Sequence, residues 1–215
     1  MSVSRFEKFA LAAGGLLVCA ALIGLAMPAT QFRGADAQPL TYFIAEGNPQ
    51  SGFQSSDREL AVWALQAWAR ATPGSLDLQA AREEDAVVRV YWSPPDDNTF
   101  GEMRPLVTHG RQGAAVFIRA DMNALGLEIG LRARRDPLWR ESIVYLTCLH
   151  ELGHALGLSH TADMRDIMYY FGYGGDIVDY FARYRQPLHT RDQIAGASGL
   201  SAADVQRVRA LHPPR

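Results

Sequence analysis

Residues 150–160 read HELGHALGLSH and contain three histidines whose spacing suits a single metal ion. His150 and His154 are four residues apart, so on an α-helix both rings lie on the same face and can reach one metal. His160 requires the chain to turn back, and Gly157 can adopt the left-handed conformation that ends a helix. Three neutral imidazoles hold Zn²⁺ and leave one coordination position for water, which is typical of catalytic rather than structural zinc.

Glu151 is the candidate general base of this site. It follows His150 and therefore lies about 100° around the helix axis from it, where a carboxylate can reach a water molecule without displacing a ligand. Two other interpretations remain: histidines that fall at this spacing by chance, and a closed structural zinc site. A structural site usually has four ligands, commonly with cysteine, and no fourth ligand is evident nearby.

The helix that must carry the site has readable limits. Asp136 suits the N-cap and Pro137 suits the first helical position, where its missing N–H does no harm. The residues that follow are apolar on most of the circumference, which predicts a buried helix. Cys148 lies in this stretch; we expect a buried thiol that packs as a small hydrophobe, with a regulatory or metal-binding thiol as the alternative.

The pattern from His150 to His160, followed by Met168 in the run DIMYY, resembles the signature of the metzincin zinc endopeptidases, H-E-x-x-H-x-x-G-x-x-H with a Met-turn. Among metzincins the chain is most similar to the matrixins. The resemblance implies an α+β fold with two lobes and a cleft between them. It also implies a twisted mixed sheet with an antiparallel edge strand, an active-site helix and a C-terminal helix. Met168 would pack beneath the ligands as a hydrophobic base.

The similarity extends over roughly residues 40–215. Residues 40–44 resemble the first strand of a matrixin catalytic domain, 57–71 its first helix, 86–92 a central strand and 200–211 the closing helix. Two departures limit what can be transferred. Thr161 stands where matrixins usually have serine, and the proline and tyrosine expected just after the Met-turn are absent at those spacings.

Tyr170 lies two residues after Met168, the position at which astacins and serralysins carry a tyrosine near the zinc. By this resemblance its hydroxyl would stabilise the developing oxyanion or act as an additional ligand. The alternative is that Tyr170, within an aromatic run, belongs to a pocket wall or to the core.

Residues 102–108, 109–113 and 114–119 predict a strand, a turn and a strand. Pro105 favours an edge position for the first strand, because proline cannot donate into a central ladder. An extended peptide could add to such an edge as a further strand. His109 with Asp96 and Asp97 is a candidate for the second, structural metal site that matrixins often have, for calcium or a second zinc. A solvated loop is the alternative.

The segment between Met168 and Leu200 is longer than the matrixin pattern predicts. In matrixins this part of the chain lines the pocket for the residue that follows the scissile bond. This insertion between Met168 and Leu200 is therefore expected to form the pocket wall or a mobile lid, with a surface decoration as the alternative.

The N-terminal residues 1–37 predict an export signal or a membrane anchor with a short linker. Residues 9–31 are uncharged and long enough to span a bilayer, and residues 35–37 suit signal cleavage; a buried soluble helix is the alternative. Either export interpretation puts the catalytic domain outside the cytoplasm, secreted or membrane-anchored. Cys148 would then be the only cysteine left after cleavage, which excludes an intramolecular disulfide.

Composition supports one catalytic domain, residues 38–215. Hydrophobic residues make up 48% of the chain and charged residues 20%, and a net charge of −2 gives no reason to expect nucleic acid binding. We expect a monomeric zinc-dependent metalloendopeptidase that acts on peptides or proteins. The alternatives are an exported zinc-binding module and a non-peptide amide hydrolase of the cell envelope.

Overall fold

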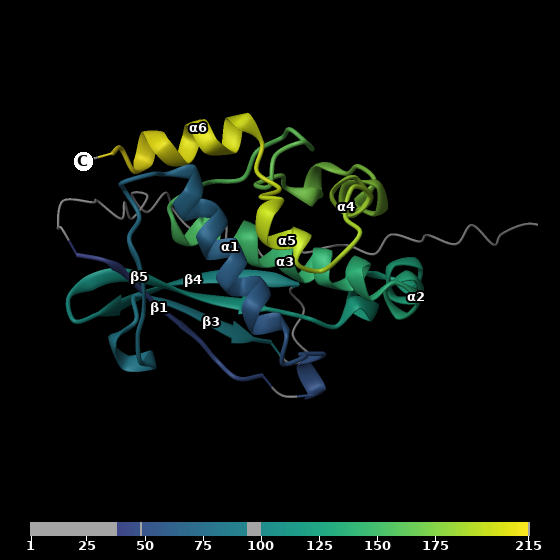
Figure 1. The fold of residues 1–215 in the computed structure, drawn as a ribbon, viewed down its shortest axis with the longest axis horizontal. Coiled ribbons are helices and arrows are strands. Elements are labelled where there is room, and N and C mark those ends of the chain that lie inside the picture. Colours follow the sequence, from purple (N-terminus) through teal and green to yellow (C-terminus); the bar gives the residue numbers. More distant parts are fainter. Residues whose placement is uncertain (1–37, 48, 94–99, 215) are drawn as a thin grey trace, which may run out of the picture.

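The computed structural model describes residues 38–47, 49–93 and 100–214, in which a twisted sheet is covered on one face by helices (Figure 1). The sheet has the order β2-β1-β3-β5-β4. Its strands are β1 Leu40–Ile44, β2 Leu78–Ala80, β3 Val88–Trp92, β4 Gly101–Thr108 and β5 Arg111–Ile118. The helices are α1 Asp57–Ala71, α2 Leu127–Arg135, α3 Pro137–Ala155, α4 Ile177–Arg185, α5 Gln193–Gly196 and α6 Ala202–Leu211.

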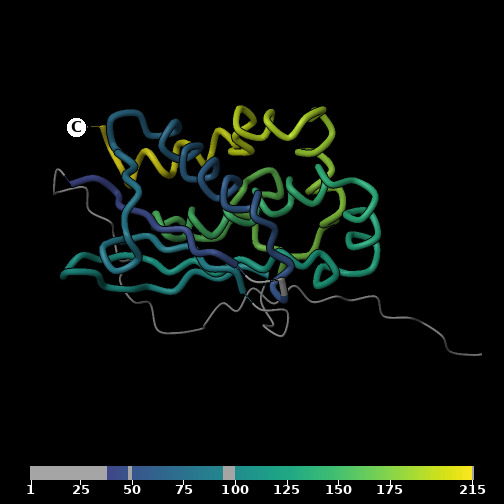
Figure 2. The backbone as a smooth tube through the Cα atoms, turned by 60° about the horizontal axis from the view of Figure 1, so that its bottom comes forward, coloured from purple at the N-terminus to yellow at the C-terminus, as the bar shows by residue number. Residues whose placement is uncertain are grey.

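Strands β1, β2, β3 and β5 are parallel, and β4 pairs antiparallel with β5. The fold is therefore the mixed α+β arrangement with an antiparallel edge strand that the sequence predicts. In β3, and in β5 from Ala114 onward, every second side chain is buried, because successive side chains of a strand point to opposite faces and one face packs against helices. Figure 2 shows the two layers edge-on, with the sheet below the helices.

The hairpin between β4 and β5 is tighter than the sequence suggests. We expected a turn over residues 109–113, but only His109 and Gly110 lie between the paired strands, both with positive φ (50° and 75°). A two-residue turn in which both residues have positive φ matches the right-handed twist of the two strands that it joins. Because the turn has only two residues, β5 begins at Arg111. Pro105 lies in β4, which is the edge strand as expected.

Helices α1 and α3 pack across the sheet and are joined by buried hydrogen bonds and an ion pair. The indole Nε1–H of Trp68 donates to the carbonyl oxygen of Leu149 over 2.9 Å. The guanidinium of Arg140 binds both carboxylate oxygens of Asp57, at 2.7 and 2.8 Å, where the Asp57 side chain is fully buried. A buried pair of this kind fixes the relative position of two helices, because either charge alone would be costly to bury.

Helix α3 has the limits that the sequence predicts. The side chain of Asp136 accepts a hydrogen bond from the backbone N–H of Trp139 at 3.1 Å, and Pro137 is the first helical residue. The helix ends at Ala155, and Gly157 has a φ of 92°. Cys148 is fully buried, and burial raises the pKa of its thiol well above the usual value. The expected buried thiol that packs in the core is confirmed.

The chain after α3 forms the remaining part of the molecule. Helix α4 packs against α3 (Figure 1), and α6 begins with a capping box in which Ser201 and Asp204 satisfy each other's backbone N–H groups. The predicted N-terminal signal or anchor, residues 1–37, lies outside the described residues, as do Asp96 and Asp97. Among the helices that are described, none is long and apolar enough to cross a membrane.

Candidate metal centre

The three histidines predicted as metal ligands converge on one point. The Nε2 atom of His160 lies 3.3 Å from Nε2 of His150 and 3.1 Å from Nε2 of His154. Four ligands placed tetrahedrally around zinc at bonds of 2.0–2.1 Å are separated by about 3.3–3.4 Å. The observed spacing is therefore close to that of three ligands around one zinc ion.

The other ring nitrogens determine which atom faces the metal. Nδ1–H of His150 donates to the carbonyl oxygen of Ile167 at 2.6 Å, and Nδ1–H of His154 donates to that of Leu158 at 2.8 Å. Both Nε2 atoms therefore present lone pairs toward the same point, an arrangement that a cation between them would satisfy.

Burial keeps these rings neutral. It lowers the pKa of His150 to about 3, with a smaller effect from His154, and lowers the pKa of His160 to about 4. The pKa of His154 is also lowered by burial. Because only a neutral imidazole has a lone pair to give, the site is in its ligand form at neutral pH without any metal to displace protons. The donor set and its protonation state fit zinc.

A short backbone pairing brings the third ligand next to the methionine turn. The N–H of Thr161 donates to the carbonyl of Met168 at 2.8 Å, and the N–H of Tyr170 donates to the carbonyl of Thr161 at 3.0 Å. This pairing places the segment after His160 beside the segment after Met168. Two stretches that are separated by the loop 162–167 thus form one wall of the site.

Met168 is fully buried and packs against α3 at Gly153, between the two histidines of that helix. Its sulfur lies where a Cβ would be if residue 153 carried one, and Trp68 closes the same space from α1. Gly153, between two of the ligands on α3, therefore lets the helix backbone rest on the methionine.

Glu151 points into the same region and is only 4% exposed. Burial, together with the negative charge of Glu102, raises the pKa of Glu151 to about 8. The carboxylate lies against the first residue of the edge strand, since a Cβ on Gly101 would be 2.5 Å from Oε1 of Glu151. A carboxylate with a raised pKa beside a metal site can take up and release a proton near neutral pH.

A small pocket of about 40 Å³ opens beside the ligands. Its wall comes from the residue just before the edge strand, from α3 and from the segment after Met168, and the residues that line it are Phe100, Leu146, Thr147, His150, Glu151, Phe171, Tyr180 and Phe181. The inserted segment is thus no surface decoration at Tyr180 and Phe181, which are buried and face the same pocket as Glu151. Phe171 packs edge-to-face on Tyr180, with 4.9 Å between the ring centroids.

Tyr170 lies next to the third ligand. Its ring centroid is 4.9 Å from that of His160, at an interplanar angle of 35°. The tyrosine ring occupies the space where a side chain on residue 172 would lie, so Gly172 allows this placement. The structure therefore brings Tyr170 to the metal centre.

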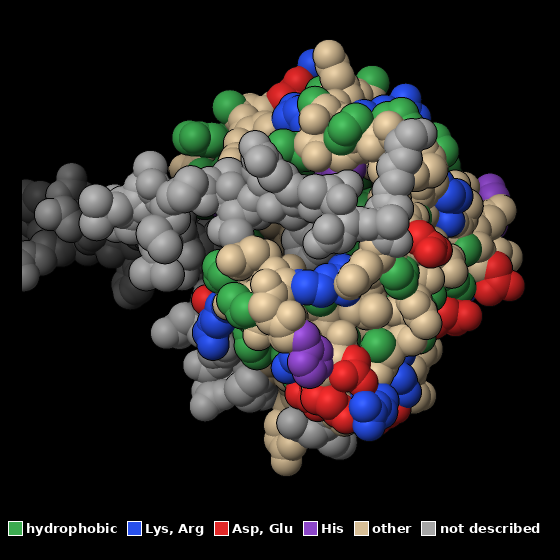
Figure 3. Space-filling model, turned by 90° about the vertical axis from the view of Figure 1, so that its left-hand side faces the viewer, with side chains coloured by type: hydrophobic (Ala, Val, Ile, Leu, Met, Phe, Trp, Pro, Cys, Tyr) green, Lys and Arg blue, Asp and Glu red, His purple; other side chains and the backbone are tan. Residues whose placement is uncertain are grey.

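The candidate second metal site is not assembled by the described residues. His109 lies at the hairpin turn, with Nε2 3.3 Å from Oδ1 of Asp85, and its two expected partners fall outside the described part. Among the described residues, the one group able to hold a metal ion is the three-histidine set. On the face of the molecule that Figure 3 shows, acidic and basic side chains are intermixed. Arg82 forms ion pairs with Glu84 and Asp85.

Several residues that build the site were missed by sequence reasoning. Gly153 could have been found, because a glycine in the middle of an apolar helix usually marks a close contact. The carbonyls of Ile167 and Leu158 could not, since backbone acceptors leave no residue-type signal. Gly101 was placed outside the expected strand, and its contact with Glu151 joins residues fifty positions apart.

The matrixin family model matches residues 34–175, about two thirds of the chain and all three histidines. No curated protein matches the chain. The match covers the sheet, helices α1 to α3 and the methionine turn, and it ends just before α4. With this match over most of the described fold, the chain belongs to the matrixin family of zinc metallopeptidases.

Proposed function

We propose that this protein is a zinc-dependent metalloendopeptidase whose metal is held by His150, His154 and His160 and whose general base is Glu151. The observation that carries the proposal is the meeting of three histidine Nε2 atoms at one point, with a buried carboxylate of raised pKa beside them. A carboxylate with a shifted pKa beside the metal ligands is typical of a catalytic site, and a protein that only binds zinc does not require one.

When bound, a zinc ion supplies Lewis-acid polarisation of the scissile carbonyl and lowers the pKa of a water molecule to about 7. Glu151 then takes the proton of the attacking water and passes it to the nitrogen of the leaving amine. The low exposure of Glu151 suits this role, because a desolvated carboxylate is a stronger base toward a proton that it faces. Met168 holds the ligands from below and touches no reacting atom.

An extended peptide is the substrate that the edge of the sheet favours. Strand β4 has an unpaired side within the described sheet and begins at Gly101, where Glu151 lies. A peptide that adds to this edge by backbone hydrogen bonds would run directly past the general base. The residue that follows the scissile bond would then enter the apolar pocket, which the aromatic side chains of the insertion help to line.

Tyr170 is proposed to stabilise the oxyanion that develops on the scissile carbonyl. Its ring lies beside His160, and a phenol is a suitable hydrogen-bond donor for that charge. We further propose that residues 1–37 export the domain or anchor it to a membrane, because residues 9–31 carry no charge.

The test is to measure zinc content and peptide cleavage with the purified full-length chain and its Glu151→Gln variant. We expect one zinc ion per chain in both, and chelator-sensitive cleavage of a diverse peptide library in the parent alone. Loss of zinc from Glu151→Gln would give the glutamate a structural role. Zinc in the parent without cleavage of any peptide would contradict the endopeptidase proposal, and absence of zinc would contradict the metal site.

A further inference from the structure

The backbone of Ile167 links the metal centre to the C-terminal helix through the peptide groups on its two sides. The carbonyl oxygen of Ile167 accepts the Nδ1–H of His150 at 2.6 Å. The N–H of Ile167 donates to Oδ2 of Asp204, in the first turn of α6, at 2.8 Å. The orientation of one zinc ligand therefore depends on how firmly α6 holds the backbone at Ile167.

Two carboxylates lie on either side of the link, and both are buried. Asp166, just before Ile167, is 3% exposed, and Asp204 is 0% exposed. Ser201 Oγ–H donates to Oδ1 of Asp166 at 2.6 Å, and the backbone N–H of Ser201 donates to Asp204 at 2.9 Å. Neutral donors alone leave two negative charges close together in a region with little water, where they repel each other.

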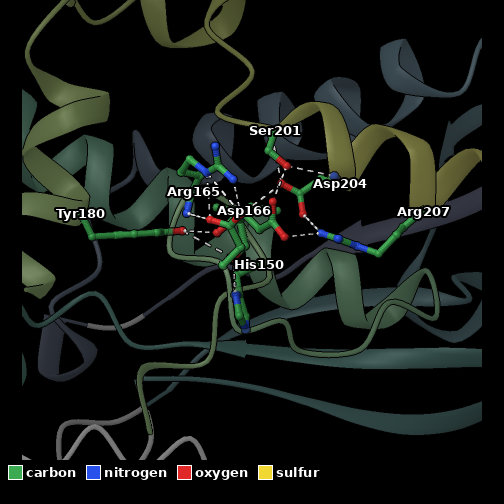
Figure 4. Close-up of polar contacts among 9 residues, drawn as sticks. His150, Arg165, Asp166, Tyr180, Ser201, Asp204 and Arg207 are labelled. Carbon is green, nitrogen blue, oxygen red and sulfur yellow. Dashed lines mark hydrogen bonds and ion pairs between the residues drawn. The ribbon is translucent and has the colours of Figure 1, made fainter. Parts of the chain in front are cut away.

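Arg207 supplies the compensating charge. The same Nη2 atom lies 2.8 Å from Oδ2 of Asp166 and 2.7 Å from Oδ1 of Asp204. In Figure 4 the guanidinium reaches both carboxylates from α6, while His150 lies below Asp166. One arginine thus joins the segment before the methionine turn to the helix that holds the amide of Ile167.

We propose that Arg207 is a positioning residue for the metal centre: by neutralising Asp166 and Asp204 it keeps the backbone of Ile167 in place and so orients His150 toward the metal. The inference rests on the proposed zinc site. Hydrogen-bond partners that orient a metal-bound histidine commonly change metal affinity or activity by 10–100-fold when they are lost. Arg207 acts two interactions beyond the partner of His150, through Asp204 and the backbone of Ile167.

The experiment compares zinc affinity, measured by competition with a chelator, in the full-length parent, Arg207→Met and Arg165→Met. Arg165 is the matched control, because it precedes Asp166 directly but has a side chain that is 80% exposed and pairs with Asp163. We expect Arg207→Met to bind zinc about 10-fold more weakly or worse. Arg165→Met should stay within about twofold of the parent, because exposed ion pairs contribute little.

A purely structural role would lower the stability of the metal-free protein and leave the zinc affinity of the folded protein unchanged. Unfolding of the metal-free variants is therefore measured alongside. Equal zinc affinity in folded Arg207→Met and the parent overturns the inference, as does equal weakening in the Arg165→Met control. If Arg207→Met does not fold, Arg207→Gln decides, because it removes the charge and keeps a polar side chain: several-fold weaker binding supports the inference, and unchanged binding overturns it. A parent that binds no zinc would instead overturn the proposed function.

Discussion

Met168 packs against the backbone of α3 at Gly153, between the ligands His150 and His154, with no room for a side chain on the glycine. The contact couples the methionine turn to the helix that carries two of the three ligands. Two positions that are fifteen residues apart in sequence therefore have to be compatible for the ligands to keep their spacing.

Gly153→Ala should weaken the site although alanine is the better helix former. Overpacking at the Met168 sulfur costs about 1–3 kcal/mol, against which alanine gains about 1 kcal/mol in helix propensity. We expect lower stability and weaker zinc binding, measured by chemical unfolding and chelator competition. Gly196→Ala in α5 is the control, because a Cβ there meets nothing within 4 Å. Unchanged zinc affinity in Gly153→Ala would show that Met168 does not hold the ligands.

Gly101→Ala should separate catalysis from metal binding. The new Cβ would lie 2.5 Å from Oε1 of Glu151 and push the carboxylate away from its place at the edge strand. Because a displacement of about 1 Å can cost about 100-fold in rate, we expect kcat to fall by about 10–100-fold with full zinc content. Val107→Ala, at an exposed position of the same strand, should cleave like the parent. Parent-like kcat in Gly101→Ala would mean that this contact does not position the base.

Tyr170→Phe tests the proposed role of the hydroxyl. Loss of one oxyanion donor costs about 10²–10³ in kcat in enzymes where that donor is well placed. We expect kcat to fall at least about 10-fold while zinc affinity stays constant. Tyr173→Phe is the matched control, since the Tyr173 ring contacts Tyr170 at 5.3 Å and is largely exposed. If kcat of Tyr170→Phe equals that of the parent, the residue is only a wall of the site.

Stability of the metal-free protein should depend on pH through Glu151. Burial raises the pKa of this carboxyl from its ordinary value of 4.5 to about 8, so the folded state binds the proton more tightly than the unfolded chain. This contribution is fully present below about pH 4.5 and is lost as pH rises through about 8. Glu151→Gln cannot titrate and should therefore become more stable than the parent as pH rises through this window.

The expected difference near pH 8 is about 1–3 kcal/mol, below the ~5 kcal/mol of the full shift because a real interior relaxes around a charge. It is measured by denaturant unfolding of both metal-free proteins at about pH 5 and about pH 8. A difference that is equal at the two pH values would show that the Glu151 carboxyl titrates normally in the folded state.

Phe181→Leu should change the side-chain preference of the pocket. Phe181 is a buried wall of the cavity beside His150 and Glu151, and a smaller side chain deepens it. We expect the peptide library to show a shift toward larger residues after the scissile bond, at a stability cost of about 1–3 kcal/mol. Tyr180→Phe keeps its ring and should retain the parent preference. If the cleavage-site preference of Phe181→Leu equals that of the parent, the insertion does not select the substrate.

The local features of the metal helix could be predicted because each depends on neighbours in sequence. The cap at Asp136, the first-turn Pro137 and the glycine stop at Gly157 follow from backbone chemistry within a few residues. Pro105 correctly predicted the edge strand, but the predicted hairpin turn, residues 109–113, was longer than the observed turn of His109 and Gly110. The length of the turn depends on the register in which the two strands pair, and the residue types at 109–113 are compatible with several such registers.

The sequence by itself determined the ligand types, their spacing on one helix and the mixed α+β fold with an antiparallel edge. Tertiary structure alone decided which backbone carbonyls orient His150 and His154, and that Glu151 lies against Gly101. It also brought Asp166, Asp204 and Arg207 into one buried cluster. The physical reason is that these contacts join segments that are far apart in the chain. Their energies come from burial and from interactions between charges, and neither can be predicted from the neighbours of a residue in sequence.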